Sequence, residues 1–445
     1  MDAEQLKLLA AKLRESFPRE IALSRGQSLD LIAALPGLRN WPEVRAFPER
    51  LAARDYDLDA MGRLSRRIVA SFGPRLTERA TRWLDADGLM NTLMPWAVTE
   101  PRDSARRERL VIASGDSAAG SLRMSRIADR VEWIGDRLVW GPVPLGADDP
   151  ITFRASRFAA SDTEPHTDDQ PLAWERMREE PDSPIPRQWT VHLPVFSDYA
   201  RIELWVDPDA NGQLQLLHLI DWFGRQPALV DRLFVAQVRQ RIGELRPYEH
   251  RIRPPHITRV TERQIELATR AWNAFRQPTP QAWHALLAQD LDALPGLRHT
   301  VRAMLAELPA AVTGLRASER RLLELAAEDG ATPHQVMARM TRQRDPSIYD
   351  YWEMGRLLNC LGCGPCPAIT GIDDGPFDAP LHDDAARFSA YMGSPLGLSP
   401  FGLALLEGED DLFRVSPRRF WWGGTLITQD KPWRWNALGE TVSRG

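Results

Sequence analysis

One stretch constrains the fold of this chain more than any other. An apolar run at residues 110–113 breaks at Gly115 into a turn of small residues, and an amphipathic segment at residues 118–128 follows. A strand-like run, a tight turn and a helical pattern in this order are typical of the first strand, loop and helix of an α/β domain. We therefore expect strand, turn and helix N-terminus here.

Three further runs with strand character follow, at residues 131–134, 201–206 and 232–236. A second helix is expected at residues 212–223, between the last two runs. Strands separated by helical crossovers favour parallel pairing in a sheet that is covered on both faces. The sequence therefore predicts an α/β protein with a Rossmann-like parallel sheet.

The flanking segments have helical periodicity and divide the chain into four expected parts. Residues 1–55 are expected to form a small helical module, and residues 56–108 a helical connector. Residues 109–255 form the Rossmann-like domain, and residues 256–445 a mostly helical domain with C-terminal strands. Within the last part, residues 314–370 have the outline of a winged helix, three helices followed by a strand.

Composition excludes several classes of protein. The 445 residues are 43% hydrophobic and 26% charged, with a formal net charge of −5. This balance is ordinary for a soluble globular protein and gives no overall attraction to nucleic acid or to an anionic membrane. No apolar run approaches the roughly 20 residues of a membrane span, and no signal peptide is visible. A cytoplasmic location is expected.

The turn at Gly115 is the first candidate ligand site. A helix N-terminus presents free backbone N–H groups and a partial positive charge, which together attract anions. Ser117 and Ser121 are placed to donate hydrogen bonds to a phosphate or carboxylate, with Asp116 in the turn. In the alternative interpretation, Ser117 only caps the helix and Asp116 only satisfies the turn.

Other residues are expected to converge on this turn, because ligands of open parallel sheets gather at the carboxyl ends of the strands. The candidates that follow other strands are Gly141, Pro142, Asp207, Asp209 and Gln213. The turn matches neither the P-loop pattern nor the dinucleotide fingerprint. The leading hypothesis is a binding or regulatory protein for an anionic, possibly nucleotide-like, small molecule.

A Gly-Asp-Ser turn after a first strand also resembles the nucleophile block of SGNH-type esterases. That resemblance implies an ester hydrolase in which Ser117 attacks a carbonyl and a histidine from an Asp-x-x-His pair activates it. His382 is four residues after Asp378 instead of three, and His218 on the predicted helix 212–223 is the other candidate base.

The three cysteines lie close together, at Cys360, Cys363 and Cys366. Their spacing could place three thiolates around a zinc ion or an iron–sulfur cluster that takes a further ligand. Free thiols in a reducing compartment are the favoured alternative, and no metal or other cofactor is assigned.

The segment at residues 314–370 favours another alternative, a DNA-associated regulator. The second or third helix of a winged helix enters the major groove. Arg339, Arg342 and Arg344 are basic, but Asp345 and Glu353 dilute them. Nucleic acid is therefore a less favoured partner than an anionic small molecule.

The order of motifs from about residue 109 to residue 435 resembles a bacterial family built of paired domains of unknown function. The residues that carry the resemblance are the Gly115-Asp116-Ser117 turn, Trp140 to Pro144, Arg157, Leu204-Trp205, Asp209, Gln213-Leu214, Trp272, Ala274-Phe275, Gly314-Leu315 and Trp421 to Leu426. The resemblance implies the architecture and no established activity. Where that family has an acid-His-Asp stretch after the strand tryptophan, this chain has Asp207-Pro208-Asp209.

The N-terminal module has a resemblance of its own. The residues that carry it are Gln27, Leu29, Ile32, Ala33, Gly37 and Trp41. Their pattern resembles the N-terminal helical module of bacterial proteins of the glyoxalase superfamily. The metal-ligand pattern of a glyoxalase core is not visible in the sequence, so we expect a packing module or a contact site for a protein partner.

Overall fold

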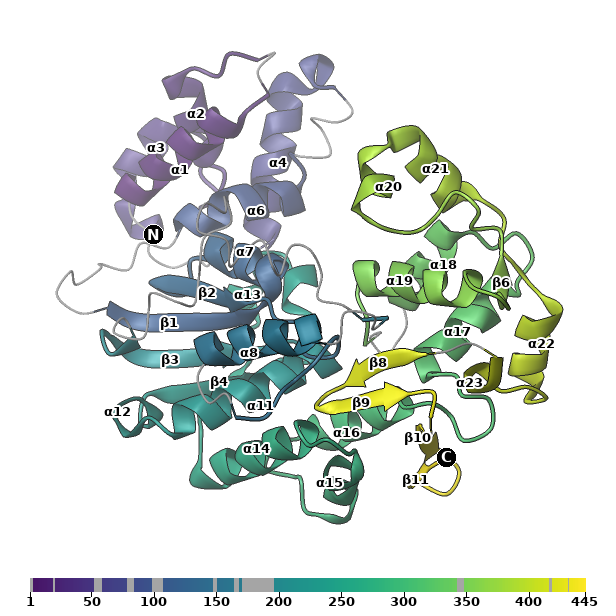
Figure 1. Cartoon of the computed structure of the whole chain (residues 1–445). Coiled ribbons are helices and arrows are strands. Elements are labelled where there is room, and N and C mark those ends of the chain that lie inside the picture. The colour runs from purple at the N-terminus through teal and green to yellow at the C-terminus, as the bar shows by residue number, and fades with distance from the viewer. Residues whose placement is uncertain are drawn as a thin grey trace.

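A five-stranded sheet in the order β2-β1-β3-β4-β5 organises the molecule (Figure 1). The computed structural model of the chain describes residues 3–18, 21–51, 58–77, 84–97, 107–146, 150–163, 168–169, 196–341, 348–415, 418–430 and 432–445. The strands are β1 (Arg107–Ser114), β2 (Arg130–Ile134), β3 (Tyr199–Trp205), β4 (Leu233–Gln237) and β5 (His256–Arg259). The first four pair in parallel and β5 pairs antiparallel to β4. The predicted α/β class with a Rossmann-like, mostly parallel sheet is confirmed.

Burial on both faces explains why the centre of β1, residues 110–113, is apolar. Leu110 and Ile112 lie in one core with α8 (Pro150–Thr163) and α11 (Ala210–Gly224). Val111 and Ala113 lie in a second core, under α7 (Gly115–Ser125) and the short 3-10 helix η3 (Ile242–Glu244). Successive side chains of a strand point to opposite faces of the sheet. Where both faces are covered by helices, consecutive residues are therefore apolar.

The chain reverses its direction across the sheet between β1 and β3. From β1 it passes through α7 to β2 on one side, whereas from β3 it passes through α11 to β4 on the other. Ligands of open α/β sheets bind at this kind of switch point, outside the carboxyl ends of the strands. The residues that end β1 and β3 are therefore the first place to look for a site.

The observed sheet extends beyond the predicted Rossmann-like domain at both its first and its last residue. β1 begins at Arg107, inside the connector that was predicted to reach residue 108. β5 has no counterpart among the predicted strands, and it extends the sheet past the predicted boundary at residue 255. Its four residues are partly or fully exposed, so it lacks the apolar run that marks the inner strands.

The N-terminal helices pack around a core of their own, above the sheet in Figure 1. They are α1 (Ala3–Ser16), α2 (Arg25–Ile32), α3 (Trp41–Ala46), α4 (Leu58–Phe72) and α6 (Ala86–Ala97), with the 3-10 turns η1 (Pro48–Arg50) and η2 (Gly73–Arg75). Tyr248, from the segment after β4, joins this core. The helical module therefore rests on the same segment that covers the carboxyl ends of the strands.

The remaining elements continue the main core of the sheet. After α12 (Pro227–Val230) and α13 (Glu249–Ile252) come α14 (Glu262–Phe275), α15 (Gln281–His284), η4 (Ala285–Ala288), α16 (Leu297–Ala306), α17 (Ala317–Ala326), α18 (Pro333–Thr341), α19 (Tyr351–Gly362), β6 (Ile369–Thr370), α20 (Ala379–Asp383), α21 (Ala385–Gly393), β7 (Gly397–Leu398), α22 (Pro400–Glu407), α23 (Leu412–Val415), β8 (Arg419–Trp422), β9 (Thr425–Thr428), β10 (Trp433–Asn436) and β11 (Thr441–Arg444). The strands form three two-stranded antiparallel sheets: β6–β7, whose strands are separated in sequence by α20 and α21, and the hairpins β8–β9 and β10–β11. Among the described residues, no helix is both long enough and apolar enough to cross a membrane.

Candidate functional site

A cavity of about 670 Å³ lies at the carboxyl ends of β3 and β4. Trp205 and Val206 line it from the end of β3, and residues 235–240 line it from the end of β4. The segment between η3 and β5 supplies another wall. Residues 294–296, Pro208, Gln264 of α14 and two residues of α11 complete the lining. This volume and this position are typical of small-molecule sites in α/β proteins.

Two arginines give the cavity its charge. Arg239 and Arg253 line it, and within the described part of the chain neither guanidinium has a carboxylate partner. Glu249 is the one acidic residue of the lining, and its carboxylate accepts a hydrogen bond from the Arg246 backbone N–H at 2.8 Å. Guanidinium groups bind phosphates and carboxylates through paired hydrogen bonds, so two of them at one cavity suit an anionic ligand.

His250 joins the cavity to the predicted turn. Its ring lines the cavity, and its Nε2 lies 2.8 Å from the hydroxyl oxygen of Ser121 on α7. The Ser121 hydroxyl also donates to the Leu245 carbonyl oxygen at 2.8 Å. Burial lowers the pKa of His250 to about 4, so the ring is neutral at neutral pH. Ser121 is thus next to the site, behind His250.

The Gly115 turn lies outside the cavity lining: Gly115 is half-buried, and Asp116 and Ser117 are exposed. Gly115 adopts a φ of +81°, which favours glycine, and the Ser117 N–H donates to the Asp116 carboxylate. A Cβ at Gly243 would lie 2.9 Å from the Cβ of Ser117, so η3 packs directly against the first turn of α7. The interpretation that Ser117 caps the helix is wrong, since α7 begins at Gly115 and Ser117 lies inside it.

Asp207 connects η3 to the ends of β1 and β3 by hydrogen bonds. Its N–H donates to the Ser114 hydroxyl at 2.8 Å, and its carboxylate accepts from the Ile242 N–H at 2.7 Å. Burial raises the pKa of Asp207 to about 6, while the Ile242 hydrogen bond acts in the opposite direction. Asp207 therefore links the ends of β1 and β3 to η3, and it shapes the wall of the cavity without lining it.

The other two candidates after β3 belong to the N-terminus of α11. Asp209 is the N-cap residue, accepting from the Gly212 N–H at 2.8 Å, and lies 3.4 Å from the Arg241 guanidinium. Gln213 lines the cavity, and its amide donates to the Asp207 carbonyl oxygen at 3.1 Å. Of the predicted ligand-binding residues, Gln213 alone is part of the cavity lining.

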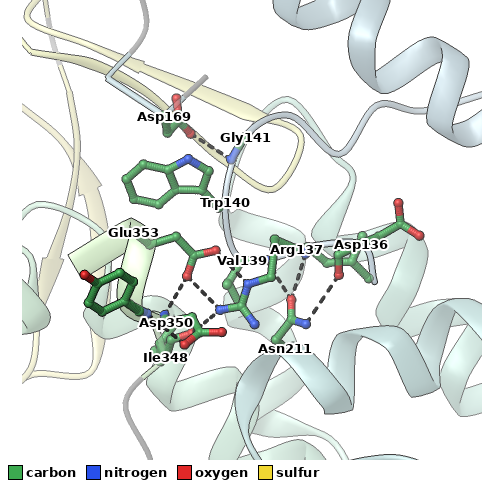
Figure 2. Close-up of polar contacts among 12 residues, drawn as sticks. Asp136, Arg137, Val139, Trp140, Gly141, Asp169, Asn211, Ile348, Asp350 and Glu353 are labelled. Carbon is green, nitrogen blue, oxygen red and sulfur yellow. Dashed lines mark hydrogen bonds and ion pairs between the residues drawn. The ribbon is translucent and has the colours of Figure 1, made fainter. Parts of the chain in front are cut away.

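Gly141 and Pro142 do not join the turn, and both are buried. Gly141 lies in a junction with the C-terminal elements (Figure 2). The Gly141 N–H donates at 3.0 Å to the Asp169 carboxylate, which also accepts from Trp421 at the β8 strand. A Cβ at Gly141 would lie 3.2 Å from the Asp169 carbonyl oxygen. The expectation that these residues converge with Gly115 is therefore wrong, because the loop after β2 turns toward the C-terminal hairpin β8–β9.

The same loop makes a buried ion pair with α19 (Figure 2). The Arg137 guanidinium contacts both carboxylate oxygens of Glu353, at 2.6 and 2.7 Å, and the Glu353 side chain has no exposed surface. Asn211 holds the loop from α11, accepting from the Leu138 N–H at 2.8 Å. The junction fixes the C-terminal elements on the sheet and contains no residue of the cavity lining.

Neither candidate base of the hydrolase hypothesis is placed at Ser117. His218 is 3% exposed in the core on the opposite face of the sheet from α7, between Phe153 and Trp272. His382 is held in the C-terminal region by the Tyr351 hydroxyl at 2.9 Å and the Asp378 carbonyl oxygen at 2.7 Å.

The cysteine segment lies at the end of α19. Cys360 is largely buried, and burial raises the pKa of its thiol to about 11, whereas Cys363 and Cys366 are exposed. Among the described residues, no group of three or more His, Cys, Asp or Glu side chains is placed to hold a metal ion.

The winged-helix outline remains a prediction. Helices α17, α18 and α19 are followed by β6, as expected from the sequence. However, every residue of α19 is buried or half-buried, and Gly355 packs on Phe377. A third helix with no fully exposed residue offers little surface to a major groove, which reduces the support for the DNA hypothesis.

The sequence analysis missed His250, Arg239 and Arg253. All three lie in residues 237–256, which were assigned to no element or site. The rule that ligands gather after parallel strands was applied to β1, β2 and β3, and the same rule applied to β4 leads to residues 237–241. No model of a known protein family matches the chain, and no curated protein matches it.

Proposed function

We propose that this chain is a binding protein for an anionic, nucleotide-like small molecule, and that the ligand occupies the cavity at the carboxyl ends of β3 and β4. One observation carries the proposal: a cavity of about 670 Å³ at this position is lined by two arginines that lack a carboxylate partner among the described residues. The net charge of the chain is −5, so this basic lining is a local feature.

The lining supports a ligand with two chemical parts. Trp205, Leu216 and Val235 supply apolar surface to an apolar or aromatic portion, while Arg239 and Arg253 suit a phosphate or carboxylate. Guanidinium groups bind such anions through paired hydrogen bonds. The Gly115 turn then supports the site through η3 and Ser121, and does not itself contact the ligand.

The test is a thermal-shift measurement with adenosine monophosphate, ribose 5-phosphate and inorganic phosphate as probes. We expect at least one phosphate ester to raise the melting temperature of the full chain, and we expect the Arg239→Gln, Arg253→Gln double variant to lose that rise. Each charged hydrogen bond contributes about 1.5–3 kcal/mol, so affinity falls at least about tenfold.

Arg270→Gln is the matched control. Arg270 is an exposed arginine of α14 outside the cavity lining, so its replacement removes a positive charge from the chain without changing the cavity. An equal loss of binding in the control, or no loss in the double variant, contradicts the proposed site.

A further inference from the structure

Two hydrogen bonds of Ser121 determine which nitrogen of His250 carries a proton. The Ser121 hydroxyl oxygen lies 2.8 Å from the Leu245 carbonyl oxygen and 2.8 Å from Nε2 of His250. A carbonyl oxygen can only accept, so the single hydroxyl proton points to Leu245. The serine then has only lone pairs to offer His250, and Nε2 must be the N–H donor.

The other ring nitrogen is consequently an acceptor. A neutral imidazole has one N–H and one lone pair, and burial lowers the pKa of His250 to about 4. With the proton on Nε2, the lone pair is on Nδ1, on the side of the ring away from Ser121. No described residue donates to Nδ1, and His250 lines the cavity.

We infer that His250 presents Nδ1 to the cavity as a fixed hydrogen-bond acceptor, and that Ser121 is the residue that positions it. This inference rests on the proposed function and narrows its ligand class. An acceptor in the same cavity as Arg239 and Arg253 selects an anion that also carries a hydroxyl or N–H donor, such as a sugar phosphate, over a bare anion.

The geometry favours a positioning role for Ser121 over a nucleophilic one. A serine nucleophile donates its proton to the histidine and faces the substrate. Here the Ser121 proton is directed to Leu245, and Ser121 is absent from the cavity lining. The pair therefore has the proton direction opposite to that of a serine hydrolase.

The first test is nitrogen NMR of the full chain with isotope-labelled histidine, without ligand and at neutral pH. We expect a neutral His250 ring with its proton on Nε2 and none on Nδ1, assigned by loss of the signal in His250→Gln. Ser121→Ala should give a mixture of both tautomers, and Ser121→Thr should restore the single one. A proton on Nδ1 in the wild type overturns the inference.

The second test compares affinities for ribose 5-phosphate and inorganic phosphate. We expect Ser121→Ala to reduce the preference for the sugar phosphate about five- to tenfold, which is the effect of one hydrogen bond, and to leave inorganic phosphate unchanged. Ser125→Ala is the matched control, because its hydroxyl bonds to the Leu122 carbonyl oxygen on the same helix and does not contact His250.

The outcomes separate the inference from the proposed function. If both probes bind and Ser121→Ala keeps the preference, His250 does not select the ligand and the inference is overturned. If neither probe binds, the proposed function and the ligand class fail together, while the tautomer measured without ligand still decides how His250 is positioned.

Discussion

The buried carboxylates of this protein differ in what surrounds them. Glu319 accepts from the Arg316 and Arg418 guanidinium groups; although burial favours the neutral acid, these cations lower its pKa to about 2. Among the described residues, Glu307 accepts only from the N–H and hydroxyl of Ser318, at 3.0 and 2.7 Å. Burial raises the pKa of Glu307 to about 7, so protonation of this residue is coupled to folding near neutral pH.

Glu307→Gln should stabilise the protein at alkaline pH and have little effect near pH 5. The folded state holds a proton on Glu307 up to about pH 7, and the unfolded chain loses it near pH 4.5. The favourable contribution is therefore complete below about pH 4.5 and is lost as pH rises through 7. Glutamine avoids the charge, so urea unfolding at about pH 8.5 should show a gain on the order of 3 kcal/mol.

The exposed residue Glu266 offers the control. Glu266→Gln should leave the difference in unfolding free energy between about pH 5 and pH 8.5 as in the wild type. If Glu307→Gln gives the same difference as the wild type, burial does not perturb Glu307 in the way described.

Single residues show the limits of prediction from sequence. Asp207, Asp209 and Gln213 were singled out because they follow a strand, and of the three Gln213 lines the cavity. The roles of Asp207 and Asp209 depend on Ile242 and Arg241, which no local pattern connects to them. The pair of Ser121 and His250 is 129 residues apart in sequence, so only the folded structure reveals it.

At the scale of elements, burial decided what could be predicted. Strands β1 to β4 have apolar runs because helices cover the sheet, and their predicted positions agree with the observed bounds to within three residues. β5 is four residues long and largely exposed, so its sequence carries no periodic signal. A helix start depends on local chemistry instead of burial. Helix α2 begins after Ser24, whose side chain forms a capping box with Gln27.

Contact between η3 and α7 leads to a prediction about two glycines. Gly243→Ala should destabilise the protein by about 1–3 kcal/mol, because its Cβ would lie 2.9 Å from Ser117 Cβ and 3.2 Å from Ala118 N. The same change should weaken binding of adenosine monophosphate, since Ile242 lines the cavity. Thermal unfolding and titration of the full chain measure the two effects.

Gly120→Ala on α7 is the matched substitution. No atom lies within 4 Å of the Cβ it would add, and alanine is favoured over glycine within a helix by about 0.5–1 kcal/mol. We expect equal or higher stability and unchanged binding. A Gly243→Ala protein that behaves like Gly120→Ala would show that η3 does not press on α7.

At the scale of the whole molecule, one continuous core joins the sheet to the C-terminal elements. The buried pair of Arg137 and Glu353 crosses the same junction (Figure 2). The pKa of Arg137 is raised: burial disfavours its charged form, but the adjacent Glu353 outweighs that effect. The sequence predicted the helices on either side of this junction, and it could not predict the pair because 216 residues separate its members.

Arg137→Met should destabilise the chain by about 3–5 kcal/mol, because it leaves the Glu353 carboxylate buried without its cation. The double variant Arg137→Met, Glu353→Gln removes the stranded charge and should recover part of this loss. Urea unfolding measures both. A double variant that is less stable than the single one contradicts an electrostatic role for the pair.

The central claim is that an anion binds at the carboxyl ends of β3 and β4. Hydrogen–deuterium exchange of the full chain, with and without saturating adenosine monophosphate, tests its location most directly. We predict slower exchange at residues 205–216 and 237–256, which contain most of the cavity lining, and unchanged exchange at residues 348–370. Slower exchange confined to residues 348–370, or no change at residues 237–256 under saturation, would contradict the account.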